Sequence, residues 1–432
     1  MQAPIAAYLQ ALHAQLVGTT AGELASYIPE LTKANPDWLG ISIVTMDGVA
    51  YSVGDAEQLF TIQSISKPFV YGMALADRGQ QAMADKVGVE PSGDAFNSIS
   101  LHPQTGAPLN PMINAGAIAT TSLVAGRTTA EQWQRIESSI ATFVGHPVTV
   151  DESVYQSESS TGHRNRAIAW MLKNFGIIEG EPMASLENYF RQCAIEVSCR
   201  DLAYMAATLA NGGVHPLTGK RALPTEHVGQ VLSVMATCGM YDYAGSWLYE
   251  IGMPAKSGVA GGVIAVLQGR LGVAVYSPPL DAKGNSVRGI EACKRISRDF
   301  SLHAFSQNSQ PSHALVRVYS GADAPSRRRP GAHLRRLLLE EASRIKYLCL
   351  QGHLAVDGAE YVIRRLQNLA AEEPVHDFIL DMHQVTGVAE SAALMLHQAR
   401  RDLSAEGKPV VCSRVHRRAA ILQPLARAAG AQ

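Results

Sequence analysis

The sequence lacks the ligand spacings of the common metal sites. No CxxC pair occurs among its six cysteines, and no HExxH arrangement occurs among its 14 histidines. The first absence argues against a cysteine-bound metal, and the second argues against a zinc hydrolase. We therefore expect buried, reduced thiols, no metal and no other cofactor.

Long apolar runs and an early basic region are missing as well. No run approaches the roughly 18 apolar residues that a membrane helix needs. The first Lys or Arg is Lys33, so the basic region that opens a signal peptide is missing. We expect a cytoplasmic protein with no membrane partner.

The sequence has little net charge. Its 432 residues carry 37 Lys+Arg and 38 Asp+Glu. The 17 basic and 12 acidic residues from position 311 onward leave the earlier part net −6 and the later part net +5. Neither imbalance argues for nucleic acid as a partner. The length and the change in composition predict two domains.

Residues 1–306 show β-rich runs near both ends and helical patterns between them. Residues 38–54 hold two such runs around Asp47-Gly48, which predicts a hairpin. Residues 261–278 read "GGVIAVLQG" and "RLGVAVYSP", while residues 62 to 250 are mostly helical in pattern. This order predicts an α/β domain in which the first and last segments close one antiparallel sheet.

A polar, Pro-containing and basic stretch over residues 307–334 is predicted to be a linker. Three apolar runs follow within residues 335–432, namely "IKYLCLQG", "DFILDM" and "PVVCS". They alternate with helical patterns, the last of which covers residues 417–429. This alternation predicts a small α/β domain of its own.

The stretch "FTIQSISKPF", residues 60–69, places Ser64 and Lys67 one helical turn apart. Residues i and i+3 share a helix face, so the two side chains can meet. A lysine buried at a helix N-terminus can be neutral enough to accept a serine proton. The alternative is an ordinary helix start in which a serine, Ser66 included, caps the helix and the lysine is solvated.

A second chemical element is Lys256-Ser257-Gly258 in "PAKSGVAGGV", directly before a β-rich run. Its glycines let a backbone N–H approach a substrate carbonyl closely. Penicillin-recognising serine hydrolases combine S-x-x-K with a similar element, but their middle motif, S-D-N or Y-x-N, is missing here. A cytosolic β-lactamase- or peptidase-like serine hydrolase is the alternative function. A non-catalytic protein on this fold is disfavoured, because Ser64 and Lys67 are both intact.

Further stretches appear in a fixed order between these two elements and before them: "YIPELTKANP", "NPMINAGAI", "QSESSTGHRNRA", "NYFRQC" and "CGMYDYAG". With them the sequence resembles the bacterial and mitochondrial type of glutaminase over residues 20–305. The resemblance implies a serine β-lactamase-like fold. It also implies hydrolysis of L-glutamine to L-glutamate and ammonia through a serine-linked γ-glutamyl intermediate.

The resemblance assigns roles to nine positions. Ser64 would be the nucleophile and Lys67 its base, and Tyr27 and Tyr241 would contact substrate or relay protons. The sequence does not decide whether Lys67 or Tyr241 is the main base, or whether the two act as one coupled unit. The further substrate-binding positions would be Asn114, Glu158, Asn165, Tyr189 and Val259. The backbone N–H groups of Ser64 and Val259 would form the oxyanion hole. Taken singly, these polar and aromatic residues could equally be exposed, packed in the core or, for Asn114, a helix cap.

The tail resembles a STAS domain over "DFILDMHQVTGVAESAALML". Ser391 falls on the phosphorylatable serine of that family, but Ala389 and Ala392 replace the usual Asp and Gly of its loop. We therefore expect Ser391 to cap a helix. The resemblances imply a regulatory domain with a protein partner, and a homo-oligomer, dimer or tetramer.

Overall fold

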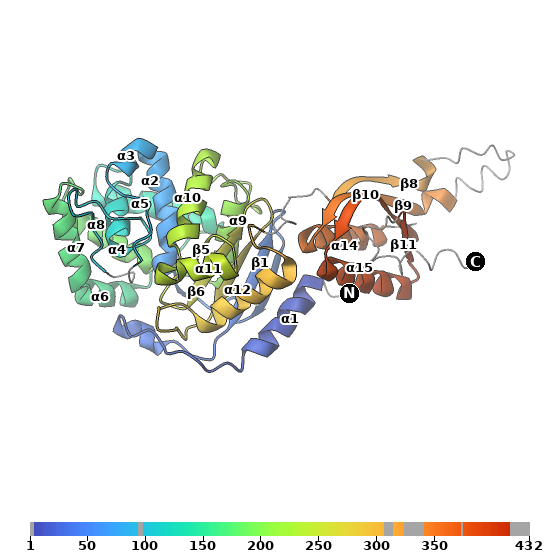
Figure 1. Cartoon of the computed structure of the whole chain (residues 1–432), viewed down its shortest axis with the longest axis horizontal. Helices are drawn as coiled ribbons and strands as arrows, with labels where there is room; N and C mark the ends of the chain where they lie inside the picture. Colours follow the sequence, from blue (N-terminus) through green and yellow to red (C-terminus); the bar gives the residue numbers. More distant parts are fainter. Residues whose placement is uncertain (1–3, 94–97, 306–313, 324–340, 373–374, 415–432) are drawn as a thin grey trace. The chain divides into compact units, whose positions relative to one another are not determined.

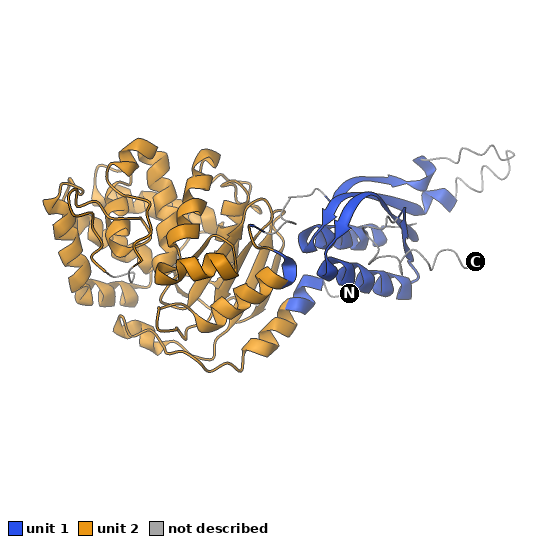
Figure 2. Ribbon diagram, viewed as in Figure 1, with its two compact units in different colours: residues 1–8, 299–301, 305–432 blue, residues 9–298, 302–304 orange. Residues whose placement is uncertain are grey.

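The computed structural model describes residues 4–93, 98–305, 314–323, 341–372 and 375–414. The chain divides into two compact units, shown in Figure 2. One comprises residues 9–298 and 302–304, and the other comprises residues 1–8, 299–301 and 305–432. A hydrophobic cluster lies within each unit, so each has a core of its own.

The larger unit is built on a five-stranded antiparallel sheet with the order β2-β1-β7-β6-β5. Its strands are β1 (Gly40–Thr45), β2 (Ala50–Gly54), β5 (Ala255–Ser257), β6 (Gly262–Leu267) and β7 (Leu271–Tyr276). Gly40 of the first strand lies opposite Tyr276 of the last. The predicted closure of the sheet by the two ends of the domain is therefore confirmed.

Helices fill the sequence between β2 and β5 and form a region beside the sheet (Figure 1). They are α2 (Ser66–Arg78), α3 (Gln80–Ala84), α4 (Asn114–Ser122), α5 (Thr129–Val144), α6 (Glu152–Thr161), α7 (His163–Asn174), α8 (Pro182–Cys193), α9 (Cys199–Ala210), α10 (Thr225–Cys238) and α11 (Ala244–Glu250). Helix α9 packs against β1, β6 and β7. Helices α1 (Pro4–Leu16) and α12 (Val287–Phe300) flank these elements in the sequence.

A short antiparallel ladder pairs β3 (Phe60–Thr61) with β4 (Glu196–Val197). The chain passes from β3 into the 3-10 turn η2 (Gln63–Ile65) and then directly into α2. Ser64 therefore lies between a paired strand and the N-terminus of a buried helix, which fixes its backbone on both sides.

The tail forms a four-stranded sheet with the order β11-β10-β9-β8. Its strands are β8 (Leu315–Ser320), β9 (Ile345–Leu354), β10 (Asp377–Val388) and β11 (Val410–Ser413), with α14 (Val356–Ala370) and α15 (Glu390–Ala405) between them. Strand β10 is parallel to β9 and β11, and β8 is antiparallel to β9. The predicted alternation of strands and helices is confirmed for these elements.

Two expectations for the tail differ from the structure. Strand β8 lies inside the stretch predicted to be a linker, because the Pro- and Arg-rich composition around it obscured its short alternating pattern. Ser391 lies within α15, whose N-cap residue is Ala389, so it does not cap the helix. The helix predicted over residues 417–429 lies outside the described residues.

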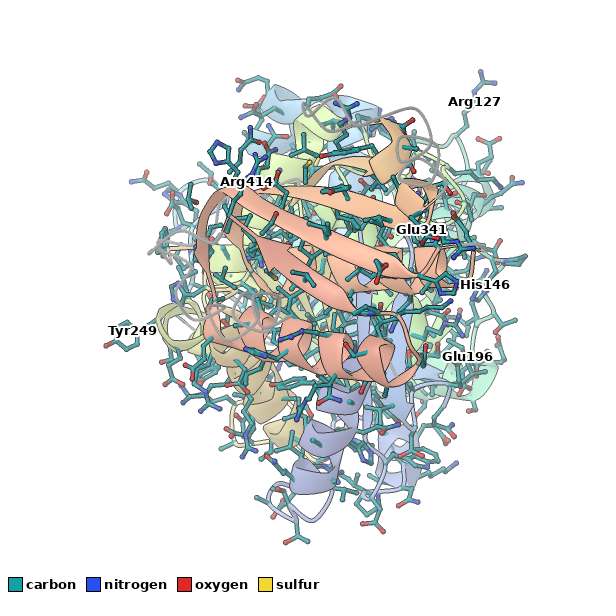
Figure 3. The ribbon with its side chains drawn as sticks, turned by 90° about the vertical axis from the view of Figure 1, so that its right-hand side faces the viewer. Arg127, His146, Glu196, Tyr249, Glu341 and Arg414 are labelled. Carbon is teal, nitrogen blue, oxygen red and sulfur yellow. The ribbon has the colours of Figure 1, made fainter. Side chains whose placement is uncertain are left out.

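Across the part of the chain that the structure describes, no helix is long and apolar enough to cross a membrane. All six cysteines are free, and five of them are buried. Tyr249 is 85 % exposed and points away from the protein in the side view (Figure 3).

Candidate active site

Ser64 is buried at the N-terminal end of α2, with 6 % of its surface exposed. The preceding residue, Gln63, has a φ of 51°, which a non-glycine residue adopts rarely and at a cost. Lys67 follows within the first turn of α2 and is 1 % exposed. The interpretation of this pair as a solvated helix start is therefore wrong.

A chain of hydrogen bonds starts at Lys67 and runs through three further elements. Lys67 Nζ donates to Asn114 Oδ1 at 2.7 Å, and Tyr189 Oη donates to the same oxygen at 3.1 Å. Asn114 Nδ2 donates to Asn165 Oδ1 at 3.1 Å, and Asn165 Nδ2 donates to Tyr27 Oη at 3.2 Å. The two donors at Asn114 Oδ1 fix the orientation of its amide. This chain places five of the predicted site residues in one network.

Glu158 comes from α6, whose start is fixed by the N-cap Asp151, which accepts from the backbone N–H groups of Ser153 and Val154. The Glu158 side chain is buried, and its Oε2 has no hydrogen-bond partner in the part of the chain that the structure describes. Burial raises the pKa of this carboxyl to about 8, and the positive charge of Lys67 opposes the rise. A buried carboxylate with a free oxygen is suited to a cationic ligand group.

Burial also lowers the pKa of Lys67 to about 8. The negative charges of Cys193 and Glu158, when ionised, act in the opposite direction. Lys256, which is fully buried as well, has its pKa lowered well below the usual value by burial and by the charge of Lys67. A fraction of Lys67 is therefore neutral near physiological pH, as a proton acceptor must be.

Strand β5 and the turn after it bring a second set of groups to Ser64. Tyr241 Oη donates to the Ser257 carbonyl at 3.1 Å and is hydrogen-bonded to the Ser64 side chain. Burial raises the pKa of Tyr241 to about 12, so its phenol stays protonated. Lys256 Nζ lies 4.0 Å from the centroid of the Tyr241 ring and donates to the Ser257 carbonyl at 2.7 Å.

The turn that contains Val259 approaches Ser64 closely. A Cβ atom on Gly258 would lie 3.0 Å from the Ile62 carbonyl oxygen and 3.5 Å from Gln63 Cβ. Only a glycine allows this distance without displacement of a neighbour. The backbone of Val259 thus lies next to the turn that carries Ser64.

Cys193 belongs to this cluster although the sequence assigned it no role. Its buried thiol is a hydrogen-bond partner of Tyr189 and Ser66. Burial raises the pKa of this thiol well above its usual value. Tyr189 and Cys193 are four residues apart on α8, and this i, i+4 spacing could have indicated that they share a face.

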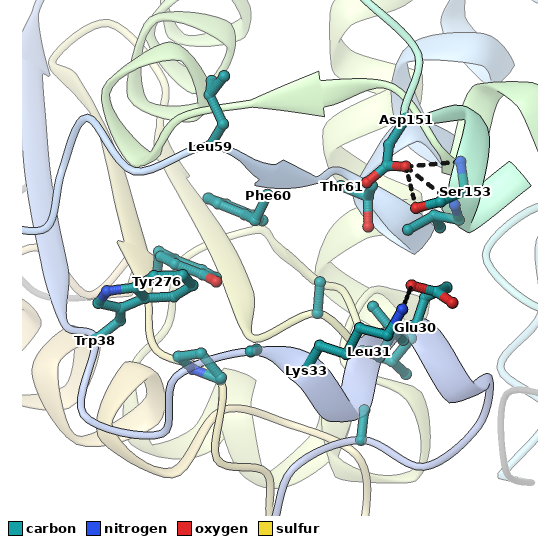
Figure 4. Close-up of a pocket in the computed structure, with 16 residues that line it drawn as sticks. Glu30, Leu31, Lys33, Trp38, Leu59, Phe60, Thr61, Asp151, Ser153 and Tyr276 are labelled. Atoms are coloured by element: carbon teal, nitrogen blue, oxygen red, sulfur yellow. Dashed lines mark hydrogen bonds and ion pairs between the residues drawn. The ribbon is translucent and has the colours of Figure 1, made fainter.

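Figure 4 shows a pocket of about 400 Å³ whose lining includes Val259. Phe60 and Tyr276 stack in its wall with ring centroids 3.8 Å apart. Glu30, Lys33 and Asp151 add charged groups to the lining. Of the nine predicted site residues only Val259 lines this pocket, so the pocket adjoins the hydrogen-bonded cluster without containing it.

The arrangement has the parts of a serine acyl-transfer site. It contains a buried hydroxyl at a helix N-terminus, a lysine of lowered pKa, and backbone N–H groups on two adjacent turns. Among the described residues, no group of three or more His, Cys, Asp or Glu side chains could hold a metal ion.

The chain is similar to known proteins over both units. The Glutaminase family model matches residues 22–305, and the STAS domain model matches residues 336–427. The glutaminase of Trichormus variabilis is 53 % identical over 302 residues, which cover 70 % of this chain and 90 % of that protein. Glutaminase 1 of Bradyrhizobium diazoefficiens is 44 % identical over 415 residues, which cover 96 % of this chain and 67 % of that protein.

A solved structure gives the same result. The crystal structure of a protein named Mglu has a TM-score of 0.70 and 39 % sequence identity, covering 96 % of this chain and 100 % of that one. The predicted fold class, a serine β-lactamase-like domain followed by a STAS domain, is therefore confirmed. The chain belongs to the glutaminase family and carries a C-terminal STAS domain.

Proposed function

We propose that the protein hydrolyses L-glutamine to L-glutamate and ammonia, with Ser64 as the nucleophile. The observation that carries this proposal is the buried Ser64 and Lys67 pair on one helical turn, in which burial lowers the pKa of Lys67 to about 8. A nucleophilic serine needs an adjacent base of this kind. The glutaminases of Trichormus variabilis and Bradyrhizobium diazoefficiens support the choice of substrate.

Glu158 binds the α-ammonium group of glutamine. Its Oε2 is buried and has no hydrogen-bond partner among the described residues, and an ammonium group would pair with it. The amide and phenol groups of Asn114, Asn165, Tyr189 and Tyr27 bind the α-carboxylate end of the substrate. Crystal structures of Mglu include one in its glutamate form, in agreement with an amino-acid ligand for this fold.

The reaction proceeds by acyl transfer. Ser64 Oγ attacks the side-chain amide carbon of glutamine while the base removes the hydroxyl proton of Ser64. The amide nitrogen then receives a proton, its bond to the carbon breaks, and it leaves as ammonia. Water then cleaves the γ-glutamyl ester and releases glutamate and free Ser64. The backbone N–H groups of Ser64 and Val259 stabilise the oxyanion formed in both steps.

Lys67 is the group whose protonation state controls the first step. The phenol of Tyr241 is hydrogen-bonded to Ser64, but its pKa of about 12 keeps it protonated at neutral pH. Tyr241 therefore relays a proton between Ser64 and its surroundings, whereas Lys67 can accept one.

Release of ammonia and glutamate from glutamine by the purified chain tests the proposal. We expect turnover by the wild type and a loss of at least about a thousandfold in Ser64→Ala, as is usual for removal of a nucleophile. A chromogenic β-lactam, assayed in parallel, tests the alternative serine hydrolase. Equal ammonia release by wild type and Ser64→Ala would refute the proposed glutaminase reaction.

We also infer from the family resemblance that residues 1–306 contain the catalytic domain and that the tail is a regulatory or interaction domain that binds a protein partner. The same resemblance supports a homo-oligomer, dimer or tetramer, and a cytoplasmic location. Light scattering of the full chain would measure the oligomer, and a pull-down with the full chain would test for a protein partner of the tail.

A further inference from the structure

We propose that Ser66 is a positioning residue whose hydroxyl, together with the left-handed backbone of Gln63, aims the backbone N–H of Ser64 at the substrate carbonyl oxygen. This inference rests on the proposed function, because that N–H is one of the two oxyanion donors. Ser66 lies between the nucleophile and its base, and the proposed reaction gives it no other role.

The carbonyl group of Gln63 is held from two directions by one residue. Ser66 Oγ donates to the Gln63 carbonyl oxygen at 2.8 Å, and the backbone N–H of Ser66 donates to the same oxygen. Ser66 is fully buried, so water does not compete for this carbonyl. The orientation of the Gln63 carbonyl is therefore fixed.

The orientation of the Ser64 N–H follows from that of the Gln63 carbonyl. Both groups belong to one planar trans peptide unit, in which the C=O and N–H bonds point in opposite directions. The Gln63 oxygen points along α2 toward Ser66. The Ser64 N–H consequently points away from the helix, as free N–H groups at a helix N-terminus do.

The second oxyanion turn lies close to Gln63 and to the peptide unit that precedes it. The Cβ position of Gly258 is 3.0 Å from the Ile62 carbonyl oxygen and 3.5 Å from Gln63 Cβ. The turn that presents the Val259 N–H therefore packs against Gln63, the residue whose backbone sets the rotation of the Gln63–Ser64 peptide.

The backbone of Gln63 has the strain expected of a functional constraint. Its φ of 51° makes it one of four non-glycine residues with positive φ in the described ranges, and Tyr241, at 56°, is another at this site. The Gln63 side chain is buried, and its Nε2 donates to Thr61 Oγ1 at 3.3 Å. The Ser66 hydrogen bond offsets part of the cost of this conformation.

Ser66 does not cap the helix in the usual sense. It is the first residue of α2, the N-cap position belongs to Ile65, and the Ser66 hydroxyl donates to a carbonyl instead of accepting from an N–H. The thiol of Cys193 is also hydrogen-bonded to the Ser66 side chain. The hydroxyl is thereby held between the oxyanion turn and α8.

The test compares Ser66→Ala with Ser297→Ala in the full chain. Ser297 is a matched control, because it is also buried and its Oγ donates to a backbone carbonyl, that of Ile251, at 2.6 Å. We expect Ser66→Ala to lower kcat about tenfold with KM changed less than about twofold. This loss is smaller than the roughly 10²- to 10³-fold that removal of an oxyanion donor costs. Ser297→Ala should leave both constants unchanged.

Two inhibitors separate positioning from general damage. An aldehyde analogue of glutamate forms a tetrahedral adduct with Ser64 and uses the oxyanion donors, whereas L-glutamate binds without an adduct. In Ser66→Ala the aldehyde should bind about tenfold more weakly, and glutamate should bind as in the wild type. Equal losses for both ligands, or an unchanged kcat, would overturn the inference.

A second pair of variants tests the backbone directly if Ser66→Ala folds poorly. Gln63→Gly can adopt a positive φ without strain, whereas Gln63→Val cannot. We expect kcat to be at least about tenfold lower in Gln63→Val than in Gln63→Gly, and equal values would refute the inference. If the wild type released no ammonia, both the proposed function and this inference would be refuted. If the wild type were active and Ser66→Ala were fully active as well, only the inference would be refuted.

Discussion

A single methyl group at Gly258 should slow catalysis without unfolding the protein. In Gly258→Ala the new Cβ would lie 3.0 Å from the Ile62 carbonyl oxygen, 3.2 Å from Ile65 Cγ1 and 3.5 Å from Gln63 Cβ. The first two distances are shorter than ordinary contacts, so the Gly258 turn must move by a few tenths of an ångström. That movement shifts the Val259 N–H away from the substrate oxygen.

The size of the effect follows from two limits. Overpacking by one methyl group typically costs about 1 to 3 kcal/mol. Complete loss of an oxyanion donor raises the barrier by about 2.7 to 4 kcal/mol. A displaced but retained donor should cost about 1 to 2.7 kcal/mol, and because about 1.4 kcal/mol is tenfold in rate, kcat should fall about 5- to 100-fold. KM should change little, since the donor acts mainly in the transition state.

The assay is steady-state ammonia release with glutamine, together with thermal unfolding. Gly245→Ala is the matched control, because Gly245 lies in α11 and a Cβ there would meet nothing within 4 Å. The control should retain full kcat and gain about 0.5 to 1 kcal/mol of stability. If kcat of Gly258→Ala stayed within twofold of the control, the proposed position of the oxyanion hole would be wrong.

Three further predictions concern the base, its neighbours and the tail. In the wild type kcat should rise with pH through about 8, because Lys67 accepts a proton only when neutral and its pKa lies near that value; a flat pH profile would contradict this role. Asn114→Asp places a negative charge at the position 2.7 Å from Lys67 Nζ, so the rise in kcat should move to higher pH. Glu158→Gln removes a charge that favours protonated Lys67, so the rise should move to lower pH. Shifts of both variants in the same direction would contradict the role of Lys67 as the base. Phe378→Ala leaves a cavity in the core of the tail and should lower the free energy of unfolding of that unit by about 3 to 5 kcal/mol. Calorimetry on the full chain measures this loss, and an unchanged unfolding profile would contradict the prediction.

Local patterns in the sequence predicted most elements of the fold. The turn at Asp47-Gly48 joins β1 and β2, and Gly48 has the positive φ of 85° that such a turn favours. The alternation of apolar runs and helical patterns predicted β9, α14, β10, α15 and β11. These features depend on residues close together in the chain, where backbone conformation and side-chain periodicity carry the signal.

Strand β8 shows where that signal ends. Residues 315–320 are only partly buried, because the strand lies at the edge of the sheet and pairs with β9 alone. An edge strand needs no continuous apolar pattern, so composition suggested a linker in its place. Likewise, the sequence could not place the start of α15 to within one residue, and Ser391 falls just inside the helix instead of at its cap.

The S-x-x-K pair and its ordered companion motifs were enough to identify the family and the candidate nucleophile, because spacing along one helical turn is a local property. The surroundings that give those residues their chemistry depend on tertiary structure. Lys67 meets Asn114 across 47 residues of sequence, and Tyr241 meets the Ser257 carbonyl across 16. The lowered pKa of Lys67 and the raised pKa of Glu158 both arise from burial. No short stretch of sequence specifies this burial, because several helices and the sheet together exclude water from the site.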